Sequence, residues 1–363
     1  MSADPIVVDG HVDIAWNYFS NGRHFPQSAL AGRAQERGSV VAQNYGARMV
    51  GLPECLLGRV ALLVGTIFVA PTSSAFFSDE KVLYDTQEEA TRWGRRQLDY
   101  YHRLADEHEK IALVRTQAEL DAVLATWAEG MTLAEHRVGI IVGMEGADPI
   151  QSPAHLEEWH ARGLRVLGPA WTGTRYSGGT RAPGPLTPLG RALLDVMADF
   201  GMVLDLAHMA PEATLEALDR YEGPLFASHA NPLKFCPEAT TRSLSDEVIR
   251  RIAERGGAVG IVPFNLFLVR GWRPGDRKDA ATLQTVVAAI DHVCQLTGSA
   301  QHVGLGSDFD GGFGAESTPV GLDTIADLLS IGEQLRLRGY TPEDVAAILG
   351  GNFLRILRAG LPA

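Results

Sequence analysis

Eight short apolar runs are spread along the chain, and a stretch with helical spacing of apolar residues follows most of them. Each run is rich in aliphatic or β-branched residues and ends in polar ones, which is typical of a buried strand. Strands that alternate with helices in this way predict parallel βαβ units. The expected strands span residues 6–9, 61–69, 139–144, 165–170, 202–207, 225–228, 258–263 and 303–307.

The chain length favours one barrel over a string of smaller domains. A (β/α)8 barrel commonly uses about 250 residues and tolerates insertions, so 363 residues accommodate one barrel with additions. We therefore expect an α/β fold, a (β/α)8 TIM barrel, as a single domain over residues 1–363. Insertions are expected over the C-terminal rim, and a helical tail at 342–358. The other expected helices span 85–109, 153–162, 188–200, 211–221, 245–255, 280–297 and 323–338, with a short strand at 111–114 and the helix after it as an insertion.

Two segments that follow expected strands show no clear periodicity. Residues 17–53 are polar and contain glycine, and residues 176–187 are rich in glycine and proline. Because each follows a core strand, both are expected over the rim where the strands end. They are interpreted either as lids or pocket walls, or as plain surface loops.

Charge and composition exclude several classes of partner. A net charge of −12 without any run of Lys or Arg argues against nucleic acids and anionic membranes. No stretch of about 18 apolar residues is present, so no membrane-spanning helix is expected. The start MSADPIVVDG lacks a basic segment before an apolar stretch, and the end lacks a hydrophobic anchor. Cys55, Cys236 and Cys294 form no CxxC pair, so we expect reduced thiols in a cytoplasmic protein.

Residues that commonly bind divalent metals stand at the ends of four expected strands. DGHVD places His11 and Asp13 two residues apart, where side chains of an extended segment point to the same side. Glu145 closes the apolar run GIIVGMEG, where a buried carboxylate is costly without a cation or hydrogen-bond partner. His208 in MVLDLAH and His229 in FASHAN end two later strands. Because these strand ends meet at one rim of a barrel, the five residues predict a binuclear metal centre.

Each of these residues alone would also fit an ordinary hydrogen-bonded or salt-bridged strand end. In combination, imidazole and carboxylate ligands without thiolate favour two Zn²⁺, and Mn²⁺, Co²⁺ or Fe²⁺ also suit them.

Asp308 in GLGSDFDGG follows the eighth strand. We expect it to accept a proton from a bridging water and to pass it to a leaving nitrogen. The alternative for Asp308 is a turn residue before two glycines. Asp310 is expected in a loop or behind the ligands.

With these residues assembled, the chain resembles the membrane dipeptidase (renal dipeptidase) family of binuclear zinc peptidases, as a soluble member of bacterial type. The similar motifs run in order from DGHVDIAW through DTQEEA, GMEGAD, DLAHM, SHAN, TTRSLSDEVI and GSDFDGG to GGNFLRIL. The resemblance implies a barrel of the metallo-dependent hydrolase type that hydrolyses dipeptides, with tolerance for a D-residue at the C-terminal position. It also implies a homodimer.

The resemblance also implies roles for individual residues. Arg242 matches the arginine that binds the terminal carboxylate of the substrate, which its fork of donors suits. The alternative is a surface arginine before the helix at 245–255. The ligands divide between two zinc ions as His11 with Asp13, and His208 with His229, with Glu145 bridging.

The chain departs from the family at the end of the fourth strand. The family has a histidine there that stabilises the oxyanion, whereas GLRVLGPAW places Trp171 at this position. An indole N–H donates a hydrogen bond but cannot carry a positive charge. Arg175 or Tyr176 are nearby candidates for this donor. The stretch GTIFVAP after the second strand also differs, so we expect the chemistry to be retained better than the specificity.

The expected reaction is attack by a metal-bridging hydroxide on the amide carbonyl of a small dipeptide. Asp308 would carry the proton, and Arg242 would select a free carboxylate. The alternative is an amidohydrolase or lactonase acting on another small carboxylate-bearing acyl compound, because Trp171 alters the pocket. A metal-binding protein without catalysis is a third possibility, which the retained ligands and Asp308 disfavour.

Overall fold

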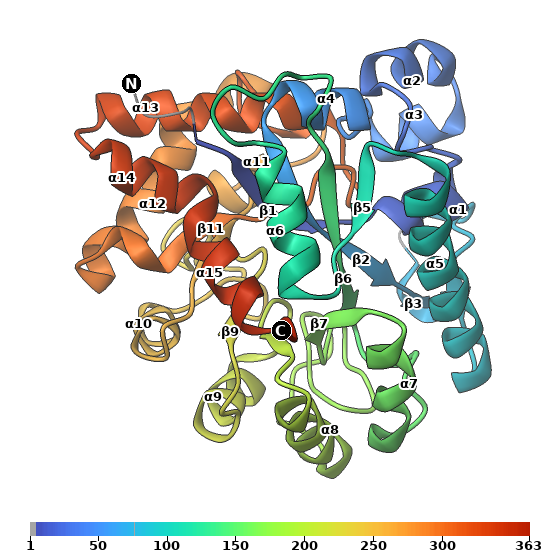
Figure 1. Cartoon of the computed structure of the whole chain (residues 1–363). Coiled ribbons are helices and arrows are strands. Elements are labelled where there is room, and N and C mark those ends of the chain that lie inside the picture. The colour runs from blue at the N-terminus through green and yellow to red at the C-terminus, as the bar shows by residue number, and fades with distance from the viewer. Residues whose placement is uncertain (1–4, 76) are drawn as a thin grey trace.

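Eight parallel strands form the centre of the computed structural model, which describes residues 5–75 and 77–363 (Figure 1). Hydrogen bonds join the strands in the order β10-β11-β1-β2-β6-β7-β8-β9. Just beyond β9, Ala227 pairs with Val259 of β10, so the ring is nearly closed. The barrel strands are β1 (Val7–Val12), β2 (Val60–Phe68), β6 (Val138–Glu145), β7 (Leu164–Gly168), β8 (Val203–Asp205), β9 (Leu225–Phe226), β10 (Val259–Ile261) and β11 (Val303–Leu305).

This arrangement confirms the predicted (β/α)8 barrel, and each expected run overlaps one barrel strand. Three short strands lie outside the ring: β3 (Ala70–Pro71), β4 (Leu83–Tyr84) and β5 (Ile111–Leu113). The absence of a leader was expected partly from the first four residues, which lie outside the described residues. Across 5–75 and 77–363, the helices are too short or too polar to cross a membrane.

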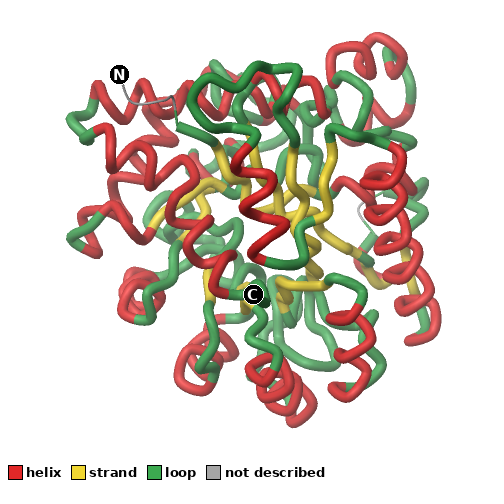
Figure 2. The backbone as a smooth tube through the Cα atoms, in the orientation of Figure 1, coloured by secondary structure: helices red, strands yellow, loops and turns green. Residues whose placement is uncertain are grey.

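Helices surround the strands on all sides, with the strands at the centre of the tube view (Figure 2). Several begin at a side-chain cap; Thr86, for example, forms a capping box with Glu89 at the start of α5. The helices are α1 (Ile14–Asn21), α2 (Ala29–Glu36), α3 (Val40–Tyr45), α4 (Leu52–Leu57), α5 (Gln87–Glu107), α6 (Gln117–Ala125), α7 (Leu156–Ala161), α8 (Pro188–Asp199), α9 (Pro211–Arg220), α10 (Asp246–Glu254), α11 (Asn265–Leu268), α12 (Leu283–Thr297), α13 (Ser330–Leu337), α14 (Pro342–Ala346) and α15 (Asn352–Ala359).

The segment 17–53 differs from the expectation of an irregular loop. It contains the end of α1, the helices α2 and α3, of eight and six residues, and the first two residues of α4. Ser28 and Ser39 cap α2 and α3 by accepting hydrogen bonds from Ala31 N and Ala42 N. Helices of about two turns contain too few residues for an apolar period to stand out, so the pattern missed them.

The insertion expected after the second barrel strand is present. β5 pairs with the first half of β6, from Val138 to Ile140. β7 pairs with β6 from Val142 onward. The two strands therefore follow one another along the same edge of β6, and β5 with α6 extends the sheet without interrupting the ring.

The N-terminal end of the barrel is closed by the tail helix α15, which lies across the strands in Figure 1. Its Phe353 is 1% exposed and packs edge-to-face on Phe226. A Cβ at Gly10 would lie 2.4 Å from the Phe353 ring, and one at Gly304 would lie 2.9 Å from it. The glycines in β1 and β11 thus make room for this ring, and the interior of the barrel is filled at this end.

Candidate metal centre and substrate pocket

The C-terminal ends of five strands deliver the predicted site residues to one rim. Glu145 is the last residue of β6, while His208, His229 and Asp308 each stand three residues beyond β8, β9 and β11. β1 extends to Val12, so His11 lies inside the strand rather than after it as expected. The structure brings all the predicted metal ligands and Asp308 together.

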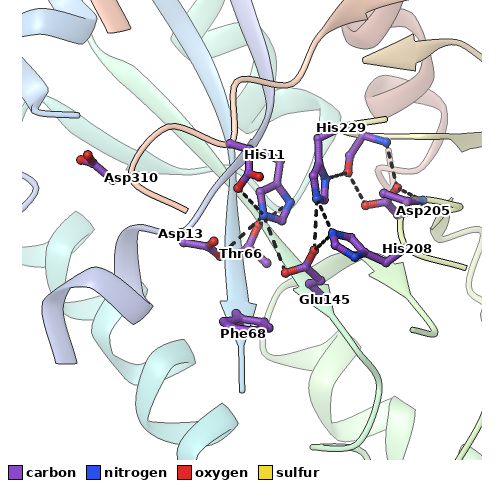
Figure 3. Close-up of polar contacts among 12 residues, drawn as sticks. His11, Asp13, Thr66, Phe68, Glu145, Asp205, His208, His229 and Asp310 are labelled. Carbon is purple, nitrogen blue, oxygen red and sulfur yellow. Dashed lines mark hydrogen bonds and ion pairs between the residues drawn. The ribbon is translucent and has the colours of Figure 1, made fainter. Parts of the chain in front are cut away.

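The three imidazoles turn their Nε2 atoms toward the carboxylates (Figure 3). Glu145 Oε1 lies 3.1 Å from His208 Nε2 and 3.2 Å from His229 Nε2. Its other oxygen, Oε2, lies 3.9 Å from His11 Nε2, which is 3.6 Å from Asp13 Oδ1. Glu145 thus stands between the pair His208 and His229 on one side and the pair His11 and Asp13 on the other.

Several buried atoms of this cluster have no hydrogen-bond partner within the part of the chain that the structure describes: His11 Nε2, Asp13 Oδ1 and Glu145 Oε1. Leaving a buried polar atom unpaired costs on the order of 1–3 kcal/mol, so a native protein normally provides a partner. Two overlapping groups have ligand atoms within 4.8 Å of one another. They are His11 with Glu145 and His229, and His11 with Asp13 and Asp308. The donor set therefore suits divalent cations.

The electrostatics of the cluster point to the same conclusion. Burial raises the pKa of Glu145 and lowers the pKa values of His208 and His229. Burial also opposes the protonation of His11, but the charges of Glu145 and Asp13 outweigh it and raise its pKa to about 10. Burial raises the pKa of Asp308 to about 7. The carboxylates Asp13, Glu145 and Asp308 outnumber the positive charge that His11 offers them, and bound cations would balance the excess.

Each imidazole also faces a hydroxyl group with its Nδ1 atom. The distances are 2.8 Å from His208 Nδ1 to Thr180 Oγ1 and 2.7 Å from His229 Nδ1 to Ser228 Oγ. For His11 the hydroxyl is that of Thr66, at 3.3 Å. When Nε2 binds a cation, Nδ1 carries the proton and donates it to such a hydroxyl, which orients the ring.

Ser228 extends this contact to a buried carboxylate. Its hydroxyl donates to Asp205, and its backbone N–H also donates to Asp205, at 2.8 Å. Burial raises the pKa of Asp205, and these hydrogen bonds oppose the rise. The sequence analysis did not identify Asp205, Ser228 or the hydroxyl groups of Thr66 and Thr180 as part of the site. Asp205 and Ser228 are nevertheless the first residues of DLAH and SHAN.

Two site residues adopt backbone conformations that disfavour a side chain. His208 has φ = 63° and Asp308 has φ = 54°, both in the left-handed region. A Cβ at Gly311 would lie 1.9 Å from Asp308 Oδ1, so the carboxylate requires a glycine at position 311. Strain of this kind persists where the surrounding structure enforces it, typically at functional sites.

Asp310 lies away from the cluster and points outward from it in Figure 3. Its carboxylate accepts hydrogen bonds from Met49 N and Val50 N and forms an ion pair of 3.2 Å with Arg23. Asp310 thus anchors the loop after β11 to the segment before α4, behind Asp308.

Arg242 is 8% exposed and lines the cavity above the cluster. Its Nη1 donates to His229 O at 2.7 Å, and its guanidinium lies 5.0 Å from the centre of the Phe267 ring. Its Nη2 has no hydrogen-bond partner among the described residues. A buried arginine with an unused donor in a cavity is suited to bind a carboxylate.

Trp171 stands where the sequence placed it, at the cavity wall beyond β7. Its ring centre is 6.4 Å from that of His208. The suggestion that Arg175 or Tyr176 supplies a donor in the pocket is wrong. Tyr176 is fully buried and donates its hydroxyl to Ile150 O, and Arg175 donates to Ile150 O and Gln151 O. Neither side chain lines the cavity, because both fasten the loop after β7 to the segment after β6.

The cavity above the cluster has a volume of about 440 Å³, within the range of small-molecule sites. The segment 176–187 contributes Thr180 and Arg181 to its wall, so this segment is a pocket wall rather than a plain surface loop. The sequence interpretation also missed Arg181, whose guanidinium lies 5.6 Å from the centre of the Trp171 ring. A lone arginine in a glycine- and proline-rich segment carries no signal that distinguishes it from a solvated one.

Comparisons with known proteins agree with this geometry. Over 227 residues, 61% of this chain, the sequence is 30% identical to an uncharacterized dipeptidase of Schizosaccharomyces pombe, and the match spans 53% of that protein. A solved structure of the dipeptidase AC, a metallo peptidase of family M19, is 26% identical with a TM-score of 0.77. The match covers 99% of this chain and all of that one.

A second solved structure, a metallo peptidase from Rhodobacter sphaeroides liganded with a phosphinate mimic of L-Ala-D-Ala, has the same fold. Its TM-score is 0.77 at 24% identity, with 98% of this chain and 100% of that chain covered. Residues 1–360 match the family described as membrane dipeptidase, peptidase family M19. The chain therefore belongs to the membrane dipeptidase family of metallopeptidases.

Proposed function

We propose that this protein is a metal-dependent dipeptidase. The observation that carries the proposal is the convergence of unpaired buried ligand atoms of His11, Asp13 and Glu145 beneath a cavity that also receives the unused Nη2 of Arg242. A site for cations next to a site for a carboxylate is what a small peptide with a free C-terminus requires. The names of the relatives support the same activity.

His11 and Asp13 would hold one ion, His208 and His229 the other, and Glu145 both. Zinc suits these ligands best. Ions bound there would lower the pKa of a bound water toward neutrality and polarise the scissile carbonyl.

Proton transfer and substrate binding are carried out by side chains of the protein. Asp308 lies 3.9 Å from His11 Nε2, and its carboxylate holds the proton lost by the attacking water and delivers it to the leaving nitrogen. Arg242 binds the C-terminal carboxylate of the dipeptide, which fixes the distance from this end to the scissile bond. Tolerance for a D-residue at the C-terminal position is part of the proposal, and the phosphinate mimic of L-Ala-D-Ala bound by the Rhodobacter sphaeroides protein supports it.

The test uses the whole protein freed of metal with a chelator and then supplied with Zn²⁺. L-Ala–L-Ala and L-Ala–D-Ala should be hydrolysed only after zinc is restored, and metal analysis should find two ions per chain. N-acetylated L-Ala amide, which lacks the free carboxylate, should react far more slowly. The proposal fails if the metal-loaded protein hydrolyses no dipeptide in a broad panel, and a lactone or N-acyl amino acid hydrolysed in their place would indicate the amidohydrolase or lactonase alternative.

Location and assembly belong to the same proposal. Cys55, Cys236 and Cys294 are free and buried, which supports a reducing compartment such as the cytoplasm. The family resemblance supports a homodimer. Light scattering of the purified protein tests the dimer directly.

A further inference from the structure

The cavity above the cluster has two aromatic walls. In the first, Phe68 and Trp171 meet edge-to-face with ring centres 4.8 Å apart, and Trp16 lies 6.1 Å from Phe68. In the second, Phe264 and Phe313 stack in parallel at 4.0 Å. All of these rings line the same cavity. We call them the Trp171 wall (Trp16, Phe68, Trp171) and the Phe313 wall (Phe264, Phe267, Phe313).

The polar groups of the site orient a dipeptide between these walls. Arg242 lies against Phe267, so a carboxylate bound to it places the C-terminal side chain beside the Phe313 wall. The Trp171 wall extends to the other part of the cluster, because Phe68 ends β2 beside β1 and Trp16 lies in α1, three residues after Asp13. The residue on the other side of the scissile bond, the N-terminal one, therefore has its side chain beside the Trp171 wall.

The charges around the Trp171 wall disfavour a charged side chain there. Among the described residues that line the cavity, the acids Asp13, Glu145 and Asp308 all belong to the cluster, so none is left for a basic side chain. Arg181 also lines the cavity and lies 5.6 Å from the centre of the Trp171 ring, but it is exposed. A charged group pressed against the rings would lose its hydration without a partner.

Resting on the dipeptidase function proposed above, we propose that the enzyme selects dipeptides whose N-terminal residue has a large apolar side chain, and that Trp171 is the specificity-determining residue. The indole face replaces hydration of that side chain by contact with an apolar surface.

The experiment compares kcat/KM for L-Xaa–L-Ala dipeptides on the zinc-loaded whole protein, with Xaa as Ala, Leu, Phe, Asp or Lys. Phe and Leu should exceed Ala by about 10- to 200-fold, the range of hydrophobic-pocket discrimination, and Asp and Lys should not exceed Ala. In Trp171→Leu the preference for Phe over Ala should fall to within about threefold, mainly through KM.

Trp127→Leu is the matched control, because Trp127 is also buried but stacks on His136 outside the cavity. It should leave the ratio of Phe to Ala unchanged, and the ratio does not depend on the amount of folded enzyme. Hydrolysis of all five dipeptides at similar rates, a preference for Asp, or an unchanged ratio in Trp171→Leu overturns this inference while the dipeptidase function stands. Hydrolysis of none of them overturns both.

Discussion

The two ends of the barrel are built from the same strands but satisfy their buried groups in opposite ways. At the N-terminal end, Phe353 fills the interior and Trp127 donates its indole N–H to Arg137 O. At the C-terminal rim, buried atoms of His11 and Glu145 lack partners among the described residues, and Asp308 adopts a left-handed backbone. The N-terminal end is closely packed, which stabilises the fold. The rim can therefore keep buried polar groups whose partners are supplied by a bound ligand.

The largest effect on activity is expected from Asp308→Asn. Asparagine keeps the shape but cannot carry the proton, so kcat should fall by about 10²- to 10⁴-fold. Because burial raises the pKa of Asp308 to about 7, the neutral amide removes an unfavourable buried charge, and the metal-free protein should be as stable as the wild type or more so. Steady-state kinetics and urea unfolding in chelator check both parts. A variant with unchanged kcat would exclude Asp308 as the proton carrier, and one destabilised by several kcal/mol would show that the rim also contributes to stability.

Phe353→Ala tests the opposite end. Removing a fully buried phenylalanine costs about 3–5 kcal/mol of the free energy of unfolding, measured as a shift of the urea midpoint. The kcat of the folded fraction should change far less than in Asp308→Asn, since Phe353 packs against Gly10 beneath the cluster and does not line the cavity. A fall in kcat as large as that in Asp308→Asn would show that the two ends are coupled.

The sequence predicted the parts of this molecule that have a repeating period. The barrel strands and the long helices such as α5 carry enough residues for their apolar pattern to be read. The helices α2, α3 and α4 are too short for that. Boundaries that depend on pairing, such as the extension of β1 through His11, follow from neighbouring strands that the local pattern does not contain.

The site divides in the same way. The metal ligands were predictable because strand ends of a barrel converge, whatever the loops do. The roles of side chains on loops were not predictable. Tyr176 and Arg181 are close together in the sequence, yet Tyr176 fastens the loop and Arg181 lines the cavity. The hydroxyl of Thr180 beside His208 is likewise a product of loop geometry.

Thr180→Val tests whether this hydroxyl orients His208. Valine keeps the shape but cannot accept the Nδ1 proton, so zinc affinity should fall by about 10- to 100-fold, as is typical for groups behind a metal ligand. Competition with a zinc-binding dye measures the affinity without reference to activity. Thr126→Val is the matched control at the other end, where Thr126 Oγ1 accepts a hydrogen bond from Arg137 N. Equal affinities in both variants would show that the contact between Thr180 and His208 has no role in metal binding.

The smallest effect is expected from a substitution that relieves left-handed backbone strain outside the metal centre. Arg59, just before β2 at the packed end, has φ = 54°, the same value as Asp308. In Arg59→Gly, the loss of left-handed strain, roughly 1–2 kcal/mol, is offset by the greater freedom of the unfolded chain and by lost contacts. Those contacts include a hydrogen bond to Pro5 O at 3.3 Å and the cation–π contact with Trp127. The free energy of unfolding should therefore change by less than about 1 kcal/mol, with kcat/KM unchanged.

Destabilisation beyond about 2 kcal/mol in urea would show that Arg59 anchors the packed end. In that case, left-handed residues would hold the structure together at both ends of the barrel, and the strain at Asp308 would no longer distinguish the rim.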